Sequence, residues 1–125
     1  MFQLSSRKRP KKTIGSEYQL QIAVVKYLRL KASRDWIFFS IAAGDNKLGA
    51  KQGALRKARG VVAGVPDMIL IRKRDGATHW IELKAGVGKL SEKQRQFHKQ
   101  LTNAGQQVAT CYSLNDVEEK LNEWK

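Results

Sequence analysis

The sequence predicts one α/β domain in which a mixed β-sheet is flanked by helices. The chain has 125 residues, 42% of them hydrophobic, which suits one domain with a substantial core. Short apolar segments typical of strands alternate with longer segments of helical periodicity. A hairpin turn signal, Asp75-Gly76, joins two of the strands, so antiparallel pairs are expected beside strands that helices connect.

The chain is expected to begin with a basic arm. Residues 1–15 are rich in Lys and Arg and lack an apolar period, which predicts a flexible tail before a domain at residues 16–125. An apolar stripe then predicts a helix from Glu17 to about Lys31, with Ser16 as its N-cap.

The other elements follow from the same kinds of signal. Aromatic and β-branched runs predict strands, the first of them buried, at Trp36–Ile41, 68–73, 79–84 and 107–112. A helix is expected at 48–59, where Ala50, Ala54 and Ala58 form a smooth packing face. A second helix should run from the capping box Ser91-x-x-Gln94 to Asn103. A last helix should run from a cap at Ser113 or Asn115 to about Trp124.

The charge of the chain indicates a polyanionic partner. Lys and Arg number 24 against 11 Asp and Glu, which gives a formal net charge of +13. Solubility alone needs a charge of only about 2–8. Nucleic acid and an anionic membrane surface both fit this charge. No expected helix pairs a Lys/Arg face with a Trp/Phe/Leu face, which favours nucleic acid over a membrane.

Composition also excludes some classes of protein. The single cysteine, Cys111, is expected to be buried, and it excludes a disulfide framework and a cysteine-built zinc site. No apolar run approaches the roughly 20 residues of a membrane span, and the N-terminus lacks the apolar region of a signal peptide. The protein is therefore expected to be soluble and to lie inside the cell.

Acidic and basic residues cluster on the predicted hairpin. If Asp75-Gly76 is a two-residue loop, Asp67 lies opposite Lys84, and Ile69 lies opposite Glu82. Because side chains alternate between the faces of a strand, Asp67, Glu82 and Lys84 then share one face. A loop longer by two residues keeps this parity, whereas a slip of one residue destroys it.

This cluster suits phosphodiester hydrolysis. Asp67 and Glu82 are expected as diagonal neighbours, roughly 5–8 Å apart at Cβ. Two carboxylates at that separation repel each other unless a cation lies between them, and oxygen ligands suit Mg²⁺ or Mn²⁺. Lys84 would stabilise the charge that develops on a phosphate. The alternative is a surface ladder of ion pairs, which contributes roughly 0–1 kcal/mol.

These residues resemble the PD-(D/E)XK nuclease superfamily, and most of all its VRR-NUC branch. The resemblance rests on Glu17, Gly64-Val65-Pro66-Asp67, Ile81-Glu82-Leu83-Lys84 and Leu90-Ser91 through Gln94, in the family's order. It implies a restriction-endonuclease-like αβββαβ core, here with one extra helix before the central hairpin and one at the C-terminus. It also implies a Mg²⁺-dependent or Mn²⁺-dependent DNA endonuclease.

The resemblance also implies roles for residues. Asp67 and Glu82 match the metal ligands, Lys84 matches the catalytic lysine, and Glu17 matches an acidic residue that contacts the metal through water. Gln94 matches the glutamine at the edge of the site. Helix stabilisation is an alternative for two of them, since Glu17 suits the first turn of a helix and Gln94 completes a capping box.

Other polar residues are assigned from the sequence alone. Phosphate contacts are expected from the basic helix and the loop before it, although a solvated face is the alternative, at Asn46, Lys47, Lys51, Arg56, Lys57 and Arg59. By the hairpin register neither His79 nor His98 lies on the face of Glu82, so both are expected to be structural or to contact phosphate.

Two classes of function remain open. The first is a metal-dependent endonuclease, and the second is a non-catalytic nucleic-acid-binding module. The VRR-NUC branch includes the nuclease domain of Fanconi-associated nucleases and stand-alone versions from phages and bacteria. This chain resembles the stand-alone type, which implies a homodimeric Holliday-junction resolvase that cuts four-way junctions. A flap-directed or general nickase is the alternative. The last helix is a candidate dimer surface, unless its apolar residues belong to the core: Leu114, Val117, Leu121 and Trp124.

Overall fold

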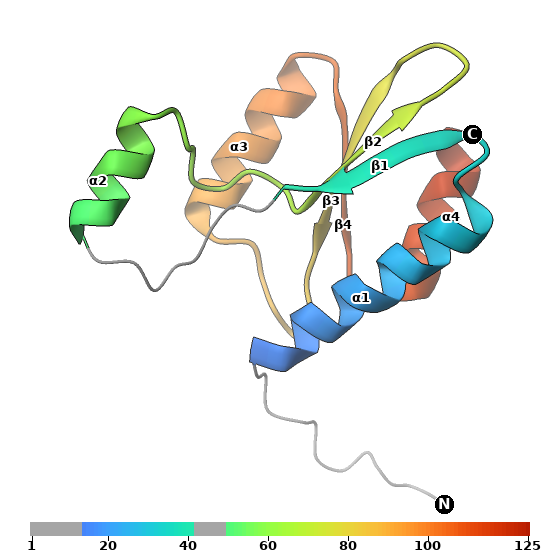
Figure 1. The fold of residues 1–125 in the computed structure, drawn as a ribbon, viewed down its shortest axis with the longest axis horizontal. Coiled ribbons are helices and arrows are strands. Elements are labelled where there is room, and N and C mark those ends of the chain that lie inside the picture. Colours follow the sequence, from blue (N-terminus) through green and yellow to red (C-terminus); the bar gives the residue numbers. More distant parts are fainter. Residues whose placement is uncertain (1–13, 42–49) are drawn as a thin grey trace, which may run out of the picture.

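The computed structural model describes residues 14–41 and 50–125 of the chain. Its elements are α1 (Ile14–Lys31), β1 (Trp36–Ser40), α2 (Ala50–Ala58), β2 (Met68–Arg72), β3 (Thr78–Leu83), α3 (Glu92–Asn103), β4 (Gln107–Cys111) and α4 (Leu114–Trp124). This order confirms the expected αβββαβ core, with α2 before the hairpin and α4 at the C-terminus (Figure 1).

The sheet is mixed, as the sequence predicted. The strand order is β1-β2-β3-β4, and both β1–β2 and β2–β3 are antiparallel. The β3–β4 pair is parallel because α3 carries the chain back across the sheet between them. Because β2 and β3 are antiparallel, the C-terminal end of β3 and the start of β2 lie at the same end of the sheet. The acidic residues are found at this end.

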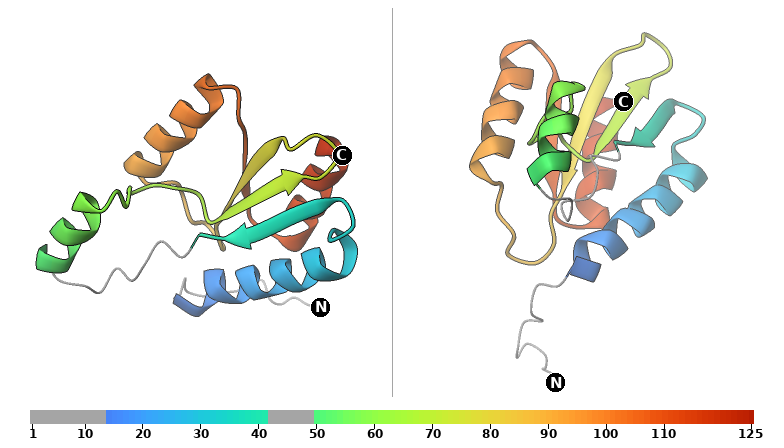
Figure 2. Two further views of the ribbon diagram at one scale, coloured as in Figure 1. Left: turned by 45° about the horizontal axis from the view of Figure 1, so that its top comes forward. Right: turned by 60° about the vertical axis from the view of Figure 1, so that its left-hand side comes forward.

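Helices cover the sheet unequally. Helices α1 and α4 pack against each other on one face, and α3 packs on β4 from the other face (Figure 2). The core lies between the strands and the α1–α4 pair and consists of Val24, Leu28, Ala32, Trp36, Met68, Leu70, Ile81, Leu83, Ala109, Cys111, Val117, Leu121 and Trp124. Cys111 is thus buried as expected, and the apolar residues of α4 other than Leu114 are core residues. Of the two alternatives given for these residues, the structure thus supports core packing and not a dimer surface.

The strand β1 is only partly buried. Its residue Trp36 is in the core, but Ile37 is 51% exposed and Phe39 is 46% exposed. The prediction of a buried strand was therefore wrong. The reason is that β1 is an edge strand, and α3 packs over β4 at the opposite edge of the same face.

The hairpin loop is longer than its turn signal suggested. Arg72 pairs with Ala77 through a backbone hydrogen bond of 2.8 Å, which leaves a loop of Lys73 to Gly76. The Asp75 carboxylate accepts hydrogen bonds from the Arg72 guanidinium and the Ala77 N–H, which stabilises this longer loop. The two-residue loop was wrong by two residues in register, a difference that keeps the predicted parity of the faces.

Helix ends agree with the sequence at α3 and α4 but not at α1. Helix α1 begins at Ile14, so Ser16 lies in its first turn and is not its N-cap. Ser91 caps α3, with the complete capping box to Gln94. Ser113, and not Asn115, caps α4. Two of the three predicted N-caps thus follow from local chemistry, and the start of α1 does not.

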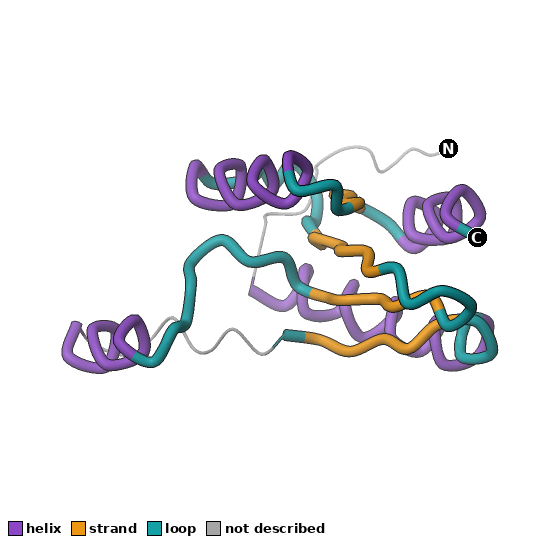
Figure 3. Tube along the Cα trace, turned by 90° about the horizontal axis from the view of Figure 1, so that it is seen from above, coloured by secondary structure: helices purple, strands orange, loops and turns teal. Residues whose placement is uncertain are grey.

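Helix α2 stands apart from the rest of the fold (Figure 3). Its residues Ala54 and Ala58 are exposed, so the predicted packing face is not used. Residues 1–13 of the predicted tail lie outside the described residues, and its last two residues belong to α1. Asn46, Lys47 and the side chain of Lys51 also lie outside the described part of the chain. Within residues 14–41 and 50–125, no helix is both long and apolar enough to cross a membrane.

Candidate active site

Asp67 is held between two strands at the start of β2. Its carbonyl oxygen accepts a hydrogen bond of 2.8 Å from the N–H of Ile41. Its carboxylate oxygen Oδ2 accepts a hydrogen bond of 2.7 Å from the N–H of Leu83 on β3. The side chain is thereby fixed beside Glu82, which precedes Leu83 in the chain.

Gly64 brings this segment close to α3. Its φ of +91° is one that residues with a side chain rarely adopt. A Cβ at this position would also lie within 3 Å of the Lys93 carbonyl group. The buried Pro66 then fixes the backbone that leads into Asp67. The chain can reach Asp67 along this path only with glycine at position 64.

Glu82 faces Asp67 across the hairpin. The observed register pairs Met68 with Ile81, and one further step places Asp67 directly opposite Glu82. The sequence had placed the two as diagonal neighbours, which was wrong because of the longer loop. Glu82 is only 2% exposed, and its Oε2 accepts a hydrogen bond of 3.1 Å from Gln94.

Burial and mutual repulsion oppose ionisation of this pair. Desolvation raises the pKa of Glu82 to about 8, and the nearby charge of Asp67 adds to the effect. Desolvation likewise raises the pKa of Asp67, against the hydrogen bond from Leu83, which lowers it. The pair therefore favours a proton or a cation that compensates its charge.

Lys84 and Glu17 complete the group that the sequence predicted. Lys84 follows β3 and is 8% exposed, and its N–H donates to the carbonyl of Cys111 at 3.0 Å. Its positive charge lowers the pKa of both Asp67 and Glu82, and the charge of Glu17 raises both. The residues come from α1, the start of β2 and the end of β3, and the fold brings them to one place.

Gln94 links the site to the start of α3. Its Oε1 accepts a hydrogen bond of 2.8 Å from the N–H of Ser91, which leaves its NH₂ group to donate to Glu82. The two roles that the sequence suggested for Gln94, helix capping and membership of the site, are therefore both present in one side chain.

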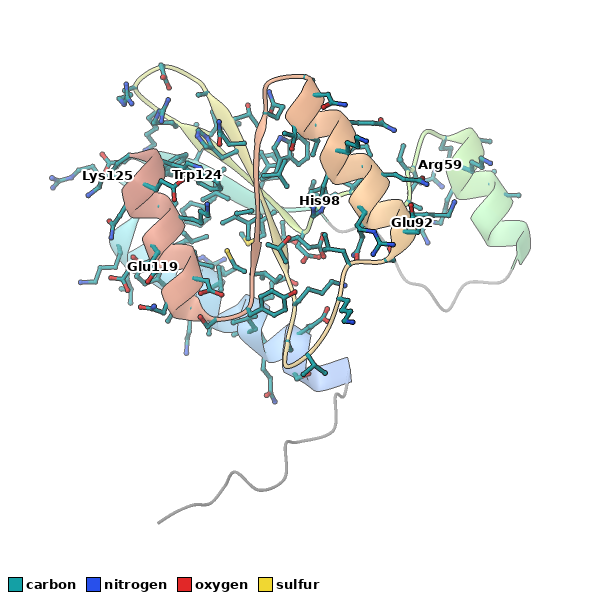
Figure 4. All side chains as sticks on the ribbon, turned by 180° about the vertical axis from the view of Figure 1, so that it is seen from behind. Arg59, Glu92, His98, Glu119, Trp124 and Lys125 are labelled. Carbon is teal, nitrogen blue, oxygen red and sulfur yellow. The ribbon has the colours of Figure 1, made fainter. Side chains whose placement is uncertain are left out.

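His98 also belongs to this site, and the sequence prediction missed it. Its Nε2 lies 3.6 Å from Oε1 of Glu82, and Figure 4 shows it on the side of α3 that faces the strands. The expectation rested on hairpin parity, which says nothing about a helix that packs over the strands. The usable signal was the spacing from Gln94, since residues four apart share a face of a helix. His79, by contrast, is a buried core residue between Trp36 and Trp124, in agreement with its structural assignment.

The residues present fit a magnesium-type ion better than a structural zinc ion. Oε1 of Glu82 is buried and lacks a hydrogen-bond partner in the described structure. Among the described residues, no group of three His, Cys, Asp or Glu side chains is placed to hold one metal. Mg²⁺ is often held by one or two carboxylates and completes its shell with waters and substrate phosphate. Asp67 and Glu82 supply that set, and the charge of Glu17 acts on both of them.

Basic residues extend outward from the site. Lys57 and Arg59 are exposed, and Arg56 is half-buried, on and just after α2. Lys89, just before α3, and Lys93 and Lys99, on α3, are also exposed. The sequence prediction did not single out these three lysines, because it placed the phosphate contacts on the basic helix and the loop before it.

Comparison with known proteins agrees with this geometry. The family model described as the VRR-NUC domain matches residues 7–115. A solved structure described as a VRR_NUC domain has a TM-score of 0.60 at 15% identity, and the match covers 88% of this chain and 98% of that one. A search of curated proteins gave no match. The chain therefore belongs to the VRR-NUC domain family, a family of nucleases of the restriction-endonuclease-like superfamily that act on DNA.

Proposed function

We propose that this protein is a metal-dependent endodeoxyribonuclease whose reacting centre is formed by Asp67, Glu82 and Lys84. One observation carries the proposal: the buried carboxylate of Glu82 faces the partly buried carboxylate of Asp67 beside the buried Lys84, and desolvation raises the pKa of both carboxyl groups. In a surface ladder of ion pairs Glu82 and Lys84 would be exposed, and a buried carboxylate next to a second one is costly without a compensating cation.

Asp67 and Glu82 would hold Mg²⁺ or Mn²⁺, with Glu17 contacting it through water. When bound, such an ion polarises the phosphate and lowers the pKa of a coordinated water. Leu83 keeps the Asp67 carboxylate in place through its N–H, and Gln94 does the same for Glu82. Both carboxylates are thus fixed before substrate arrives, which lowers the cost of binding the ion.

Lys84 would stabilise the negative charge that develops on the phosphate as the bond to the leaving oxygen breaks. It is the lysine next to both carboxylates, and its burial excludes water from the interaction. Its backbone is tied to Cys111 on β4, so the side chain projects from a fixed point.

The phosphate backbone of DNA would lie across the basic residues near α2 and α3. Lys57 and Arg59 are exposed there, and the expected contacts from Asn46, Lys47, Lys51 and Arg56 belong to the same segment of the chain. Contacts to phosphate position a duplex without reading its bases. Selection by the shape of the DNA is consistent with such a surface.

We propose further that the active form is a homodimer that cuts four-way junctions. One chain gathers one set of carboxylates and cuts one strand, whereas a junction requires two strands to be cut. A two-fold dimer supplies two sites in a symmetric arrangement, and it is the commonest form of oligomer.

The proposal is tested with the parent chain and Asp67→Ala, each given a four-way junction and a linear duplex of the same sequence in Mg²⁺. We expect paired nicks in the junction, less cutting of the duplex, no cutting by Asp67→Ala, and sedimentation as a dimer. Equal cutting of both substrates by a monomer would instead favour a flap-directed or general nickase. DNA binding without cutting in Mg²⁺ or Mn²⁺ would favour a non-catalytic binding module.

A further inference from the structure

Helix α3 presents two side chains to Glu82, one to each carboxylate oxygen. Gln94 donates to Oε2 at 3.1 Å, and His98 places its Nε2 3.6 Å from Oε1. The two residues are one helical turn apart, so the helix sets their separation. Gln94 cannot turn its amide around, because its Oε1 accepts the hydrogen bond from Ser91 at the helix start.

The contact between His98 and Glu82 is slightly too long to be a hydrogen bond. A separation of 3.6 Å is beyond a good hydrogen bond and too short to contain a bridging water. Nε2 of His98 and Oε1 of Glu82 are both buried, and neither has another partner in the described structure. Since a buried unpaired polar atom is costly, a small movement that joins these two atoms is favourable.

We propose that His98 is a positioning residue that holds the Glu82 carboxylate for the metal, together with Gln94. His98 donates from Nε2 to Oε1 when Glu82 is ionised, and Gln94 holds Oε2, so the plane of the carboxylate is fixed at both oxygens. This inference rests on the metal-dependent function proposed above. Side chains that orient a carboxylate ligand typically change metal affinity by about 10–100-fold when they are removed.

Two substitutions separate this role from simple packing. His98→Gln keeps an N–H near the position of Nε2, whereas His98→Leu fills similar space without a donor. Gln100→Ala, at an exposed position on the same helix, serves as the matched control. Each variant is first compared with the parent by circular dichroism and thermal unfolding, so that any loss of fold is seen directly.

The measurement is calorimetric titration of Mn²⁺ into each chain without DNA, followed by kcat and KM for cleavage. We expect His98→Leu to weaken Mn²⁺ binding by about 10–100-fold and to lower kcat with little change in KM for DNA. His98→Gln should recover most of the affinity, and Gln100→Ala should match the parent.

Equal Mn²⁺ affinity in His98→Leu and the parent would overturn the role of His98 while leaving the metal site intact. The same holds if His98→Gln binds as weakly as His98→Leu, because the donor would then be irrelevant. A parent chain that binds no Mn²⁺ would overturn the proposed metal-dependent function itself, and with it this inference.

Discussion

The amide of Gln94 donates to Glu82 while its carbonyl oxygen completes the capping box of α3 through Ser91. One side chain therefore connects the start of a helix to the proposed metal ligand. Any change in where α3 begins moves the donor that holds Glu82. The local signal that ends the loop after β3 thus also sets the geometry of the site.

The two roles of Gln94 can be separated by substitution. Gln94→Glu retains a capping-box residue but places a carboxylate against Glu82 where an N–H donor had been. We expect it to fold like the parent and to lose cleavage by at least tenfold, because like charges at the site repel. Ser91→Ala removes the helix cap and leaves Gln94 in place. It should lose about 1 kcal/mol of stability and keep more cleavage activity than Gln94→Glu. Urea unfolding and cleavage rates measure both, and a Gln94→Glu variant as active as the parent would contradict the role at Glu82.

The pH dependence of stability reports on the buried carboxylate of Glu82. In chelator, burial raises the pKa of Glu82 from 4.5 to about 8, so the folded chain retains a proton that the unfolded chain releases. The free energy of unfolding should therefore fall as pH rises from 7 to 8. At lower pH the histidines oppose this trend, since burial lowers the pKa of both His79 and His98 while unfolded histidine titrates at its ordinary pKa of 6.5. Their contribution fades as pH rises above 7, where histidine is mostly neutral in both states.

Glu82→Gln removes the titrating group while keeping its shape. It should be more stable than the parent at pH 8 and should show a flatter profile between pH 7 and 8. Denaturant unfolding at three pH values in that window is sufficient to measure this. A parent whose stability rises across the window, or a variant with the parent's slope, would show that Glu82 is not held in this environment.

Lys84→Met should remove most of the cleavage, by about 10²–10³-fold, the scale seen when one charge-stabilising group is lost. Met keeps the apolar length of the side chain, so the fold should be retained. DNA affinity should change little, because one buried lysine contributes few phosphate contacts. The rate is measured under single-turnover conditions. Cleavage at the parent's rate would mean that Lys84 belongs to a structural ion-pair ladder.

Gly64 offers a test of how the Asp67 segment is positioned. Gly64→Ala meets both an unfavourable φ of +91° and the Lys93 carbonyl group, and it should lose about 1–3 kcal/mol or shift the segment. Gly60→Ala is the matched control, since Gly60 has a φ of +92° with open space around it. Thermal unfolding of both variants separates backbone strain from the clash. Equal losses of stability in the two variants would mean that the close approach of Gly64 to α3 does not contribute to the cost of the substitution.

Much of the site was predictable because its determinants are local. The parity of the hairpin places Asp67 and Glu82 on one face whether the loop has two or four residues. The predicted grouping of these side chains therefore holds despite the error in register. The capping box at Ser91 likewise needs only its own four residues. What the sequence could not show was tertiary: that α3 packs so as to bring His98 to Glu82, and that β1 is an exposed edge.

Charge reversal should locate the DNA surface. If six to ten phosphates are contacted, affinity should fall by roughly 10³–10⁵ between 50 and 200 mM salt. Reversing Lys57 and Arg59 together should make this salt dependence shallower, and reversing Lys93 and Lys99 tests whether α3 contributes. Fluorescence anisotropy with labelled duplex gives the slopes. An affinity that does not respond to salt would exclude these residues as the principal contacts.

Metal-dependent cleavage is tested most directly by measuring strand cleavage by the parent chain in Mg²⁺, in excess chelator, and after Mg²⁺ is restored. DNA binding is measured in parallel. We expect chelator to abolish cleavage but not binding, and restored Mg²⁺ to recover the rate. Ca²⁺ should bind without supporting turnover, because its looser coordination aligns the reacting groups poorly. Undiminished cleavage in excess chelator would contradict a metal held by Asp67 and Glu82.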